Sequence, residues 1–276
     1  MSLTNKICVI TGASAGIGKA TAIGLAKKGY TMILLVRDSD KSRAAYEEIK
    51  AESGSDAIQM HYVELSSMAS IREVAGEITK KYAQIDILIN NAGVLKRNAE
   101  LSTDGIEMTY AVNLMAPFLL TRLLLPMVEK SPAGRIINLT SELYKKGKID
   151  FQQVASLEKF DGSKAYADSK LMVVTNTLAL AKKLAATKVT VNCVHPGVVG
   201  TDVMRDYPRW IAKSLNLFIS KPEEGAAPTI FLATSPEVAE TTGQYYSKMT
   251  QTPVNEIAAN RDTANQVWEF CEKITG

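Results

Sequence analysis

The segment Thr11-Gly-Ala-Ser-Ala-Gly-Ile-Gly18 follows the β-branched run Lys6-Ile-Cys-Val-Ile10 and opens a stretch with helical periodicity. Its three glycines permit a tight turn, a close approach of the backbone to a pyrophosphate, and close packing of the helix against the strand. The free N–H groups and the dipole of the helix stabilise an anion at this position. The spacing is GxxxGxG without a closing Gly-Lys-Ser/Thr, so a nucleoside-triphosphatase loop is not predicted. The segment predicts a dinucleotide-binding loop, and the alternative is a glycine-rich turn without a ligand.

Short β-branched runs alternate with longer amphipathic stretches along the rest of the chain. Runs such as Met32-Ile-Leu-Leu-Val36 are wholly apolar, which is typical of strands buried on both faces of a parallel sheet. No Pro/Gly/Ser-rich linker divides the chain, so we predict one α/β domain over residues 1–276: a Rossmann-type, doubly wound parallel sheet of about seven strands flanked by helices. Strands are predicted at 6–10, 31–36, 58–63, 86–90, 134–139, 189–194 and 243–247, and helices near 16–28, 40–53, 67–82, 106–130, 164–186, 222–233 and 260–274.

Two connections, near 142–163 and 201–222, are longer than turns, and both follow strands. Such loops lie outside the carboxyl ends of the sheet, where doubly wound folds bind ligands, and they commonly form lids or binding walls. The second connection is rich in apolar residues. We expect its Tyr207 and Trp210 to contact a hydrophobic substrate, and the alternative is the ordinary packing of a covering helix.

The composition is that of an ordinary globular protein. The 276 residues are 46% hydrophobic and 22% charged, and 32 Lys and Arg against 29 Asp and Glu give a net charge of +3. A charge this small and dispersed predicts no nucleic-acid binding. Cys8, Cys193 and Cys271 lie far apart without metal-ligand spacing, so we predict buried thiols and no metal site.

No targeting or integral membrane segment is predicted. The first strand begins too close to Met1 for a signal peptide. The longest apolar stretch, 114–128, contains two prolines and an arginine and is shorter than the ~20 residues of a membrane span. We therefore expect a cytoplasmic protein.

The end of the second predicted strand bears on the choice of dinucleotide. Sites that prefer NAD usually place a carboxylate here to hold the ribose 2′-hydroxyl. In this chain Val36 is apolar and Arg37 follows it. Because a guanidinium pairs bidentately with a 2′-phosphate, NADP(H) is predicted. NAD(H) is the alternative, with Asp38 as the acceptor for the ribose hydroxyl.

Reduction of a carbonyl needs a proton donor for the developing alkoxide and a group that polarises the C=O bond. The chain has only two histidines, so tyrosine is the better candidate, with a lysine four residues later on a helix to lower its pKa. Tyr-x-x-x-Lys occurs three times: the pair 46/50 lies on a charged helical face and the pair 144/148 in a loop-like segment. Only Tyr166/Lys170 opens a long helix after a strand that ends in hydroxyl residues.

Further polar side chains complete the candidate site. Ser141 closely follows the strand 134–139, at the carboxyl end of the sheet. Asn113 lies in an apolar helix and must satisfy its amide; it either orders a water toward Lys170 or makes a structural hydrogen bond. Asn90-Asn-Ala-Gly93 ends the fourth strand, where it either supports the cofactor or stabilises the sheet.

These motifs together resemble the short-chain dehydrogenase/reductase family in kind and order, over nearly the whole chain. They are the glycine loop, Asn90-Asn-Ala-Gly93, Asn113, Ser141, Tyr166-x-x-x-Lys170 and His195-Pro-Gly197. Val36-Arg37-Asp38 and His195-Pro-Gly-Val-Val199 are similar to the branch of retinol dehydrogenases and carbonyl reductases, which favours NADP(H).

The resemblance implies an oxidoreductase that interconverts an alcohol and a carbonyl, with the chain as a homodimer or homotetramer. In it Tyr166 is the general acid/base, Lys170 lowers the pKa of the tyrosine and binds the nicotinamide ribose, Ser141 binds the carbonyl oxygen, and Asn113 holds a relay water. The expected substrate contacts are Ser141, Tyr166, Tyr207 and Trp210. The expected cofactor contacts are Gly12, Ser14, Gly16, Ile17, Gly18, Arg37, Glu64, Leu65, Asn91, Ala92, Gly93, Tyr166, Lys170, Pro196, Gly197, Val199 and Thr201.

The chain departs from the family pattern at three points. Glu64 stands where many members have Asp, Ala116-Pro117 stands where a Gly is more usual, and the membrane anchor of several retinol dehydrogenases is not found, which weakens the case for a lipid-bound retinoid. Two other readings remain open. One is a catalytically silent NADP(H)-binding sensor or scaffold. The other is an epimerase or dehydratase, whose usual GxxGxxG and longer substrate domain are missing here.

Overall fold

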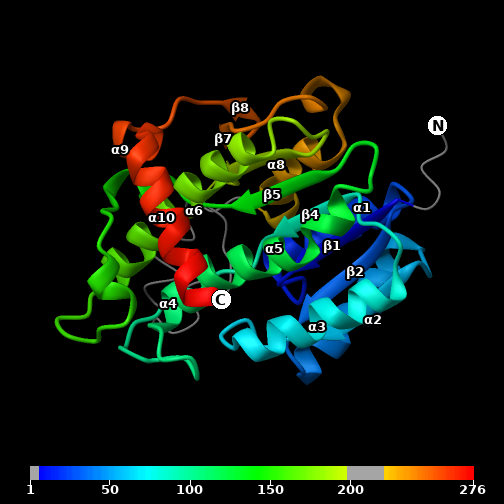
Figure 1. Cartoon of the computed structure of the whole chain (residues 1–276). Helices are drawn as coiled ribbons and strands as arrows, with labels where there is room; N and C mark the ends of the chain where they lie inside the picture. Colours follow the sequence, from blue (N-terminus) through cyan, green and yellow to red (C-terminus); the bar gives the residue numbers. More distant parts are fainter. Residues whose placement is uncertain (1–5, 198–220) are drawn as a thin grey trace.

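Eight strands form one sheet in the order β3-β2-β1-β4-β5-β6-β7-β8 in the computed structural model, which describes residues 6–197 and 221–276 (Figure 1). Neighbouring strands pair in parallel, except for the antiparallel pair β7 and β8. The predicted Rossmann-type α/β fold is confirmed, with this short antiparallel strand added to the seven expected. The strands are β1 (Ile7–Thr11), β2 (Thr31–Val36), β3 (Ile58–Tyr62), β4 (Ile87–Asn90), β5 (Arg135–Leu139), β6 (Thr190–His195), β7 (Tyr245–Ser247) and β8 (Thr250–Gln251).

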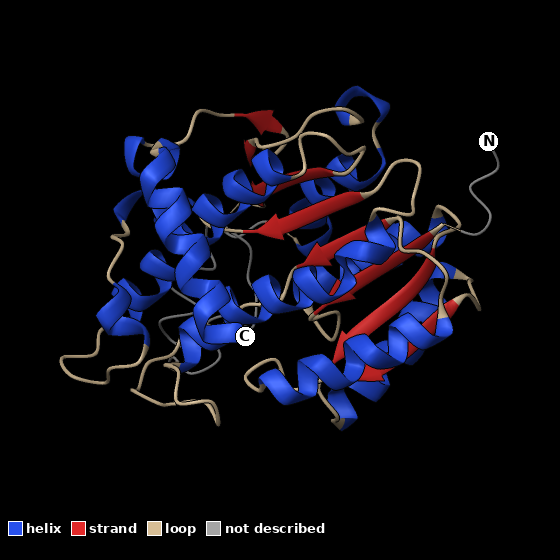
Figure 2. Cartoon of the chain, viewed as in Figure 1, coloured by secondary structure: helices blue, strands red, loops and turns tan. Residues whose placement is uncertain are grey.

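The strand order reverses between β1 and β4, which makes this the switch point of the doubly wound sheet. Figure 2 shows the arrowheads of the long strands pointing to the same edge of the sheet. The loops that follow β1, β4, β5 and β6 therefore meet at this edge. These four loops carry the glycine loop, the Asn-Asn-Ala-Gly motif, Ser141 and the segment that begins with Pro196.

Helices cover both faces of the sheet (Figure 1). One face packs against α1, α2 and α8, and the other against α3, α5, α6 and α10. Most predicted helices are found with ends that differ by a few residues. The helices are α1 (Gly16–Lys27), α2 (Asp40–Ser53), α3 (Met68–Lys81), α4 (Met108–Tyr110), the π-helix η1 (Ala111–Met115), α5 (Ala116–Val128), the 3-10 helices η2 (Glu142–Lys146) and η3 (Phe151–Val154), α6 (Gly162–Lys183), α8 (Pro222–Thr234), the 3-10 helix η6 (Pro236–Val238), α9 (Glu256–Ala259) and α10 (Arg261–Thr275).

Successive residues of β1 pack into opposite layers. Val9 belongs to the cluster beneath α3, α5 and α6, whereas Cys8 and Ile10 belong to the cluster beneath α1 and α8, and all three are fully buried. Burial on both faces explains the unbroken apolar runs in the sequence. Cys8, Cys193 and Cys271 are buried free thiols, as predicted. Burial raises the pKa of each thiol, which makes it a poor nucleophile.

The helix predicted at 106–130 contains a π-helical turn between α4 and α5. The N–H of Ala116 bonds to the carbonyl of Ala111, five residues back. Pro117 has no N–H to offer to the carbonyl four residues before it, so the ordinary α-helical bond cannot form at this point. Turns of this kind are frequent at functional sites, and this one carries Asn113.

The same helical segment is the one stretch of the described chain that is long and apolar enough to cross a membrane. It runs from Met108 to Val128, 21 residues, has a mean hydropathy of 1.6 in its most apolar 18-residue window, and is longer than the apolar stretch 114–128 because the π-helix joins α4 to α5. Of its most apolar 18-residue window, 72% is buried within the protein. Buried core helices of folded domains meet the same criteria of length and composition.

The first long connection, 142–163, is packed against the start of α6. The side chain of Tyr144 is fully buried. A Cβ at Gly147 would come within 2.5 Å of the main-chain oxygen of Ala167. The first part of this segment, near residues 144–148, is therefore a fixed wall against α6 rather than a free lid. Most of the second connection, residues 201–220, lies outside the described residues.

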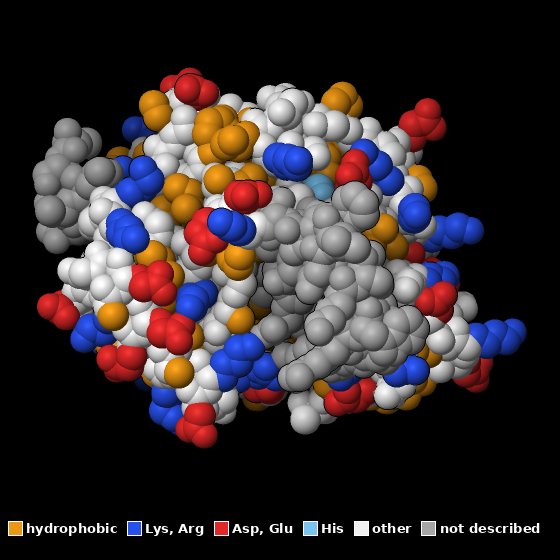
Figure 3. Space-filling view, turned by 180° about the vertical axis from the view of Figure 1, so that it is seen from behind, with side chains coloured by type: hydrophobic (Ala, Val, Ile, Leu, Met, Phe, Trp, Pro, Cys, Tyr) orange, Lys and Arg blue, Asp and Glu red, His pale blue; other side chains and the backbone are white. Residues whose placement is uncertain are grey.

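Basic and acidic side chains are interspersed on the coloured part of the face shown in Figure 3, in keeping with the net charge of +3. Among the residues that the structure describes, no group of three or more His, Cys, Asp and Glu side chains is arranged to hold a metal ion.

Candidate active site

The glycine loop joins β1 to α1 at the carboxyl edge of the sheet. Gly12 (φ +72°) and Gly16 (φ +53°) adopt the left-handed conformation that favours glycine. A Cβ at Gly18 would lie 2.3 Å from the main-chain oxygen of Gly12. Ala15, the N-cap of α1, makes no side-chain hydrogen bond to the first N–H groups of the helix, which leaves them for an anion. The cradle therefore fits the pyrophosphate of a dinucleotide.

Asn91 and Ala92 hold the glycine loop from the end of β4. Their N–H groups both donate to Oγ1 of Thr11 at 3.0 Å. The Nδ2 of Asn91 donates to the main-chain oxygens of Thr11, at 2.8 Å, and Gly12, at 3.2 Å. These contacts give the Asn-Asn-Ala-Gly motif a structural role in shaping the cradle.

Asn90 has a different role from Asn91. Its Nδ2 donates to Oδ1 of Asn138 on β5, at 2.8 Å, and to Oγ1 of Thr121 on α5, at 3.0 Å. The Asn138 amide in turn donates to Thr177 on α6 at 2.9 Å. This buried network ties the central strands to the helices that cover them, which matches the sheet-stabilising alternative.

Two guanidinium groups follow β2. Arg37 is exposed directly after the strand. Arg43, in the first turn of α2, pairs with Asp38 and also with Asp40 at 2.8 Å. Hydrogen bonds to these carboxylates raise the pKa of Arg43. The carboxylate of Asp38 is therefore already engaged by a cation. Arg43 was not predicted, because sequence spacing does not show that the turn brings it back to Asp38.

The turn after β3 contains the expected adenine contacts. The carboxylate of Glu64 accepts hydrogen bonds from the N–H of Ser66, at 3.1 Å, and its hydroxyl, at 2.8 Å. Leu65 packs against the hydrophobic core. The roles of both residues toward a cofactor stay predictions.

Ser141 and Tyr166 meet beyond the end of β5. The Ser141 hydroxyl accepts from the N–H of Leu143 at 3.3 Å, which caps η2, and it lies near enough to the Tyr166 hydroxyl to influence the pKa of that group. Tyr166 is 9% exposed. Burial raises the pKa of its hydroxyl to about 12, while the nearby Ser141 hydroxyl acts in the opposite direction. The sequence predicts that Lys170 lowers this pKa, but the net direction in the structure is upward, because the loss of water on burial outweighs the other influences.

Lys170 lies one helical turn beyond Tyr166 on α6. Its Nζ donates to the main-chain oxygen of Leu139 at 3.0 Å and lies over the Tyr166 ring, 5.6 Å from the centroid. The side chain is buried, and burial lowers its pKa to about 8. The ammonium therefore keeps its charge at neutral pH, in surroundings where electrostatic interactions are stronger than in water.

Asn113 is hydrogen-bonded to the protein through both its amide oxygen and its amide nitrogen. Its Oδ1 accepts from the N–H of Val94 at 2.8 Å, and its Nδ2 donates to the Val94 carbonyl at 2.9 Å and to the Ser169 hydroxyl at 3.1 Å. These contacts support the structural alternative. The Oδ1 of Asn113 and the Nζ of Lys170 nevertheless lie near the same point beside Gly93, because a Cβ at Gly93 would be 3.4 Å from each atom.

The segment after β6 forms another side of the site. His195 ends the strand, and burial lowers the pKa of its imidazole. Gly197 has φ +96°, so it adopts a conformation that favours glycine. The predicted contacts Val199, Thr201, Tyr207 and Trp210 lie outside the described residues.

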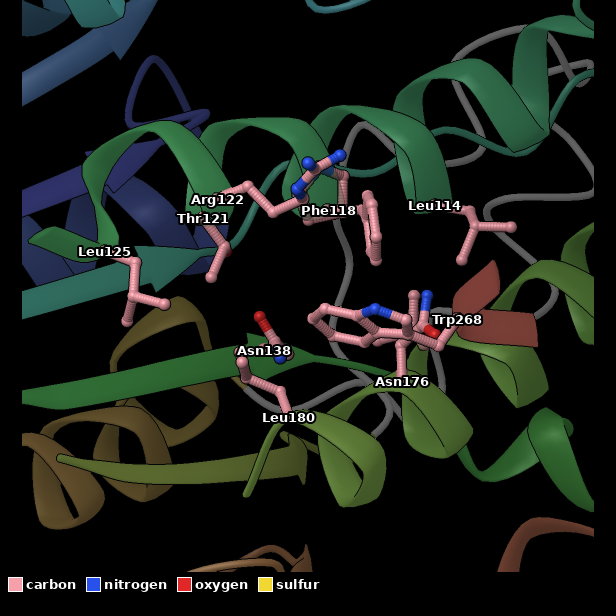
Figure 4. Close-up of a pocket in the computed structure, with 11 residues that line it drawn as sticks. Leu114, Phe118, Thr121, Arg122, Leu125, Asn138, Asn176, Leu180 and Trp268 are labelled. Atoms are coloured by element: carbon pink, nitrogen blue, oxygen red, sulfur yellow. The ribbon is translucent and has the colours of Figure 1, made fainter. Parts of the chain in front are cut away.

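A separate cavity lies between α5, α6 and α10 (Figure 4). Phe118 and Trp268 face each other there, with ring centroids 4.8 Å apart and an edge-to-face arrangement. The predicted catalytic residues are not among those that line it. The lining residues are Leu114, Pro117, Phe118, Thr121, Arg122, Leu125, Asn138, Val173, Asn176, Leu180 and Trp268.

Comparison with known proteins agrees with this geometry. The family model described as short chain dehydrogenase matches residues 6–212. The chain belongs to the short-chain dehydrogenase family. It is 35% identical to human retinol dehydrogenase 13, over 100% of this chain and 86% of that protein, and 33% identical to human retinol dehydrogenase 14, over 98% and 86%.

Solved structures of the short-chain dehydrogenase fold are similar over most of the chain. An uncharacterized protein from Mycobacterium paratuberculosis has a TM-score of 0.80 at 26% identity, covering 99% of this chain and 94% of its own. A short chain dehydrogenase from Shigella flexneri complexed with NADP has a TM-score of 0.71 at 25% identity, covering 90% and 99%.

Membership of the short-chain dehydrogenase family makes the chain an oxidoreductase and confirms the family predicted from the motifs. The structure brings Ser141, Tyr166 and Lys170 together at the carboxyl edge of the sheet, beside a glycine cradle that fits a dinucleotide. A phenol, a hydroxyl and an ammonium in this arrangement can move a proton to or from an oxygen atom.

Proposed function

We propose that this short-chain dehydrogenase interconverts a hydrophobic alcohol and its aldehyde or ketone with NADP(H) as the cofactor. The observation that carries the proposal is the buried ammonium of Lys170 over the ring of Tyr166, with the Ser141 hydroxyl near that tyrosine at the carboxyl edge of the sheet. The names of the retinol dehydrogenases among its relatives support an alcohol–carbonyl couple.

The side chains of the site have separate tasks in this reaction. The cofactor, when bound, supplies or accepts the hydride. The Ser141 hydroxyl donates a hydrogen bond to the carbonyl oxygen and polarises it. In the direction of reduction, the Tyr166 hydroxyl gives its proton to that oxygen as negative charge develops there. A pKa near 12 keeps the phenol protonated at neutral pH, which is the state that reduction requires.

Lys170 stabilises the negative charge that is left on the tyrosine oxygen after proton transfer. Its ammonium acts within a buried site, where a charge is poorly screened. In the direction of alcohol oxidation the same positive charge favours removal of the Tyr166 proton, because it stabilises the phenolate.

The choice of NADP(H) rests on the end of β2. Arg37 is exposed directly after the strand, and Arg43 engages Asp38, the one carboxylate proposed above as a ribose acceptor. Two guanidinium groups suit a 2′-phosphate better than a 2′-hydroxyl. Relatives of the same fold have been solved with NADP, such as RhlG from Pseudomonas aeruginosa, which is 27% identical with a TM-score of 0.71 over 89% of this chain and 95% of its own.

A substrate panel tests the reaction. Short and long aliphatic aldehydes, aromatic aldehydes, ketones and a retinoid aldehyde are each incubated with NADPH, and with NADH in parallel, while the absorbance of the reduced cofactor is followed. We expect turnover with NADPH that increases with the apolar surface of the carbonyl. Stoichiometric NADPH binding without turnover on every carbonyl, or on the matching alcohols with NADP, would instead favour a cofactor-binding sensor or scaffold.

Two variants test the cofactor choice. Arg37→Ala removes one guanidinium. We expect kcat/KM for NADPH to fall about tenfold or more, which corresponds to about 1.4 kcal/mol, while kcat/KM for NADH changes little. Arg43→Ala also frees Asp38, so we expect it to lower the NADPH to NADH ratio in the same direction. An enzyme that prefers NADH, or an Arg37→Ala variant with unchanged affinity for NADPH, would contradict the assignment.

A further inference from the structure

α6 carries a buried carboxylate that the proposed mechanism does not use. Asp168 lies between Tyr166 and Lys170 on this helix and is 1% exposed. Residues two apart on a helix point in different directions, so Asp168 does not face the same way as the two catalytic candidates. A buried carboxylate needs partners, and those of Asp168 come from three parts of the chain.

The shortest hydrogen bond of Asp168 is to the main chain of the wall segment. Its Oδ1 accepts from the N–H of Lys148 at 2.7 Å. Its Oδ2 accepts from Nζ of Lys164, one turn earlier on α6, at 2.9 Å, and from the hydroxyl of Tyr110 at 3.5 Å. The side chain of Lys164 is 43% exposed, whereas that of Asp168 is almost fully buried.

Two of these partners lie close in sequence to a catalytic candidate. Lys148 closes the short segment that begins with Ser141 and contains η2. Tyr110 ends α4 directly before the π-helix that holds Asn113. Asp168 therefore links three of the segments on which the active site is built.

The fit between the wall segment and α6 leaves little room for adjustment. A Cβ at Gly147, the neighbour of Lys148, would be 2.5 Å from the main-chain oxygen of Ala167, the neighbour of Asp168. Tyr144, in the same segment, is fully buried. A shift of this segment along α6 would move Ser141 relative to Tyr166.

We propose that Asp168 is a positioning residue, which keeps the Ser141 hydroxyl beside Tyr166 by holding the main chain of Lys148 against α6. This inference rests on the proposed function, in which these two hydroxyls act on one oxygen atom. The Lys148 contact is the essential one. The contact of Lys164 with Asp168 does not hold the wall segment, because Lys164 lies on α6 itself, one turn before Asp168.

A double-mutant cycle separates this role from general destabilisation. Asp168→Ala is expected to lower kcat on the order of a hundredfold, the cost of a displacement of ~1 Å, with little change in NADPH affinity. In a Ser141→Ala background the same substitution should lower kcat only about threefold or less, because the group that it positions is gone. Equal losses in both backgrounds, or no loss in the first, would overturn the proposal.

Two further variants serve as controls. Asp168→Asn keeps an oxygen that can accept from Lys148, so it should retain most of the activity and rescue a poorly folding Asp168→Ala. Lys164→Met removes an ion pair within α6 but leaves the Lys148 and Tyr110 contacts, so we expect lower thermal stability with kcat within about threefold of the wild type. A Lys164→Met variant as impaired as Asp168→Ala would show that the ion pair, and not the main-chain contact, matters.

Hydrogen exchange gives a readout that does not need turnover. We expect amide exchange in residues 142–150 to accelerate about tenfold or more in Asp168→Ala and to stay unchanged in Lys164→Met, because only the first variant releases the Lys148 N–H. Unchanged protection in Asp168→Ala overturns the positioning role whatever the activity. A wild-type protein without turnover on any carbonyl overturns the proposed function instead, and the exchange result still decides whether Asp168 holds the wall segment.

Discussion

The ammonium of Lys170 lies over the ring of Tyr166, 5.6 Å from the ring centroid. Both side chains are buried, and burial moves their pKa values toward the neutral forms: that of Lys170 falls to about 8 and that of Tyr166 rises to about 12. At neutral pH the site therefore holds a protonated phenol beside an ammonium that loses its proton at a lower pH than an ordinary lysine does. The shift in the pKa of Lys170 can be measured on the protein without cofactor or substrate.

The lowered pKa of Lys170 predicts how stability changes with pH. Between about 8 and the ordinary value of 10.5, the unfolded chain keeps a proton on this lysine that the folded chain has lost. Unfolding then takes up a proton, so this group makes the folded state more stable as pH rises through that window, by about 3 kcal/mol in all. The buried thiols and Tyr166 act in the opposite direction, so the effect is isolated as a difference between wild type and Lys170→Met.

Urea unfolding of both proteins at pH 7, 8, 9 and 10 measures this difference. We expect the free energy of unfolding of the wild type to gain on that of Lys170→Met above pH 8. A difference that is constant across the range would mean that Lys170 titrates near its ordinary pKa in the folded protein.

Gly93 lies beside both Asn113 and Lys170. A Cβ at this residue would come 3.4 Å from Oδ1 of Asn113 and from Nζ of Lys170, distances that the fold can accept. We expect Gly93→Ala to fold normally but to fill the space in which a water would join the two groups, and so to lower kcat on the order of tenfold or more. NADPH affinity and melting temperature serve as controls. Full activity in a stable variant would leave Asn113 with a structural role alone.

The glycine cradle predicts a sharp difference between two Gly→Ala variants. At Gly18 a Cβ would be 2.3 Å from the main-chain oxygen of Gly12 and 2.4 Å from the amide of Asn91, so we expect a loss of about 1–3 kcal/mol in stability and loss of NADPH binding. Gly76, inside α3, has no neighbour within 4 Å of such a Cβ, and Gly76→Ala should be more stable by about 0.5–1 kcal/mol. Thermal unfolding with and without NADPH distinguishes them; equal behaviour would contradict the close packing of the cradle.

Local patterns were enough to predict the features that depend on short stretches of chain. The unbroken apolar run of β2 indicated a strand buried on both faces, and residues 11–18 indicated the cradle. The choice of Tyr166 and Lys170 among three Tyr-x-x-x-Lys pairs stays a prediction, and the structure places Tyr166 near Ser141 because each residue lies next to a recognisable element. Strand β8 has two residues, too few for a periodic pattern.

Other features depend on contacts between distant residues. The π-helix at 111–115 places Asn113 against Val94 and Ser169, and Pro117 was the one local sign of an irregular turn. The pairing of Arg43 with Asp38 depends on the path of the chain between β2 and α2. The raised pKa of Tyr166 reflects burial, which no spacing of Tyr and Lys reveals.

The activity of Tyr166→Phe tests the central claim most directly, because this variant removes one oxygen atom from a buried ring and leaves the packing intact. The measurement is kcat for NADPH oxidation with the best carbonyl of the panel, together with NADPH affinity. We predict that kcat falls on the order of 10²- to 10⁴-fold while the affinity is retained. Undiminished turnover by this variant would contradict proton transfer by Tyr166 and with it the proposed mechanism.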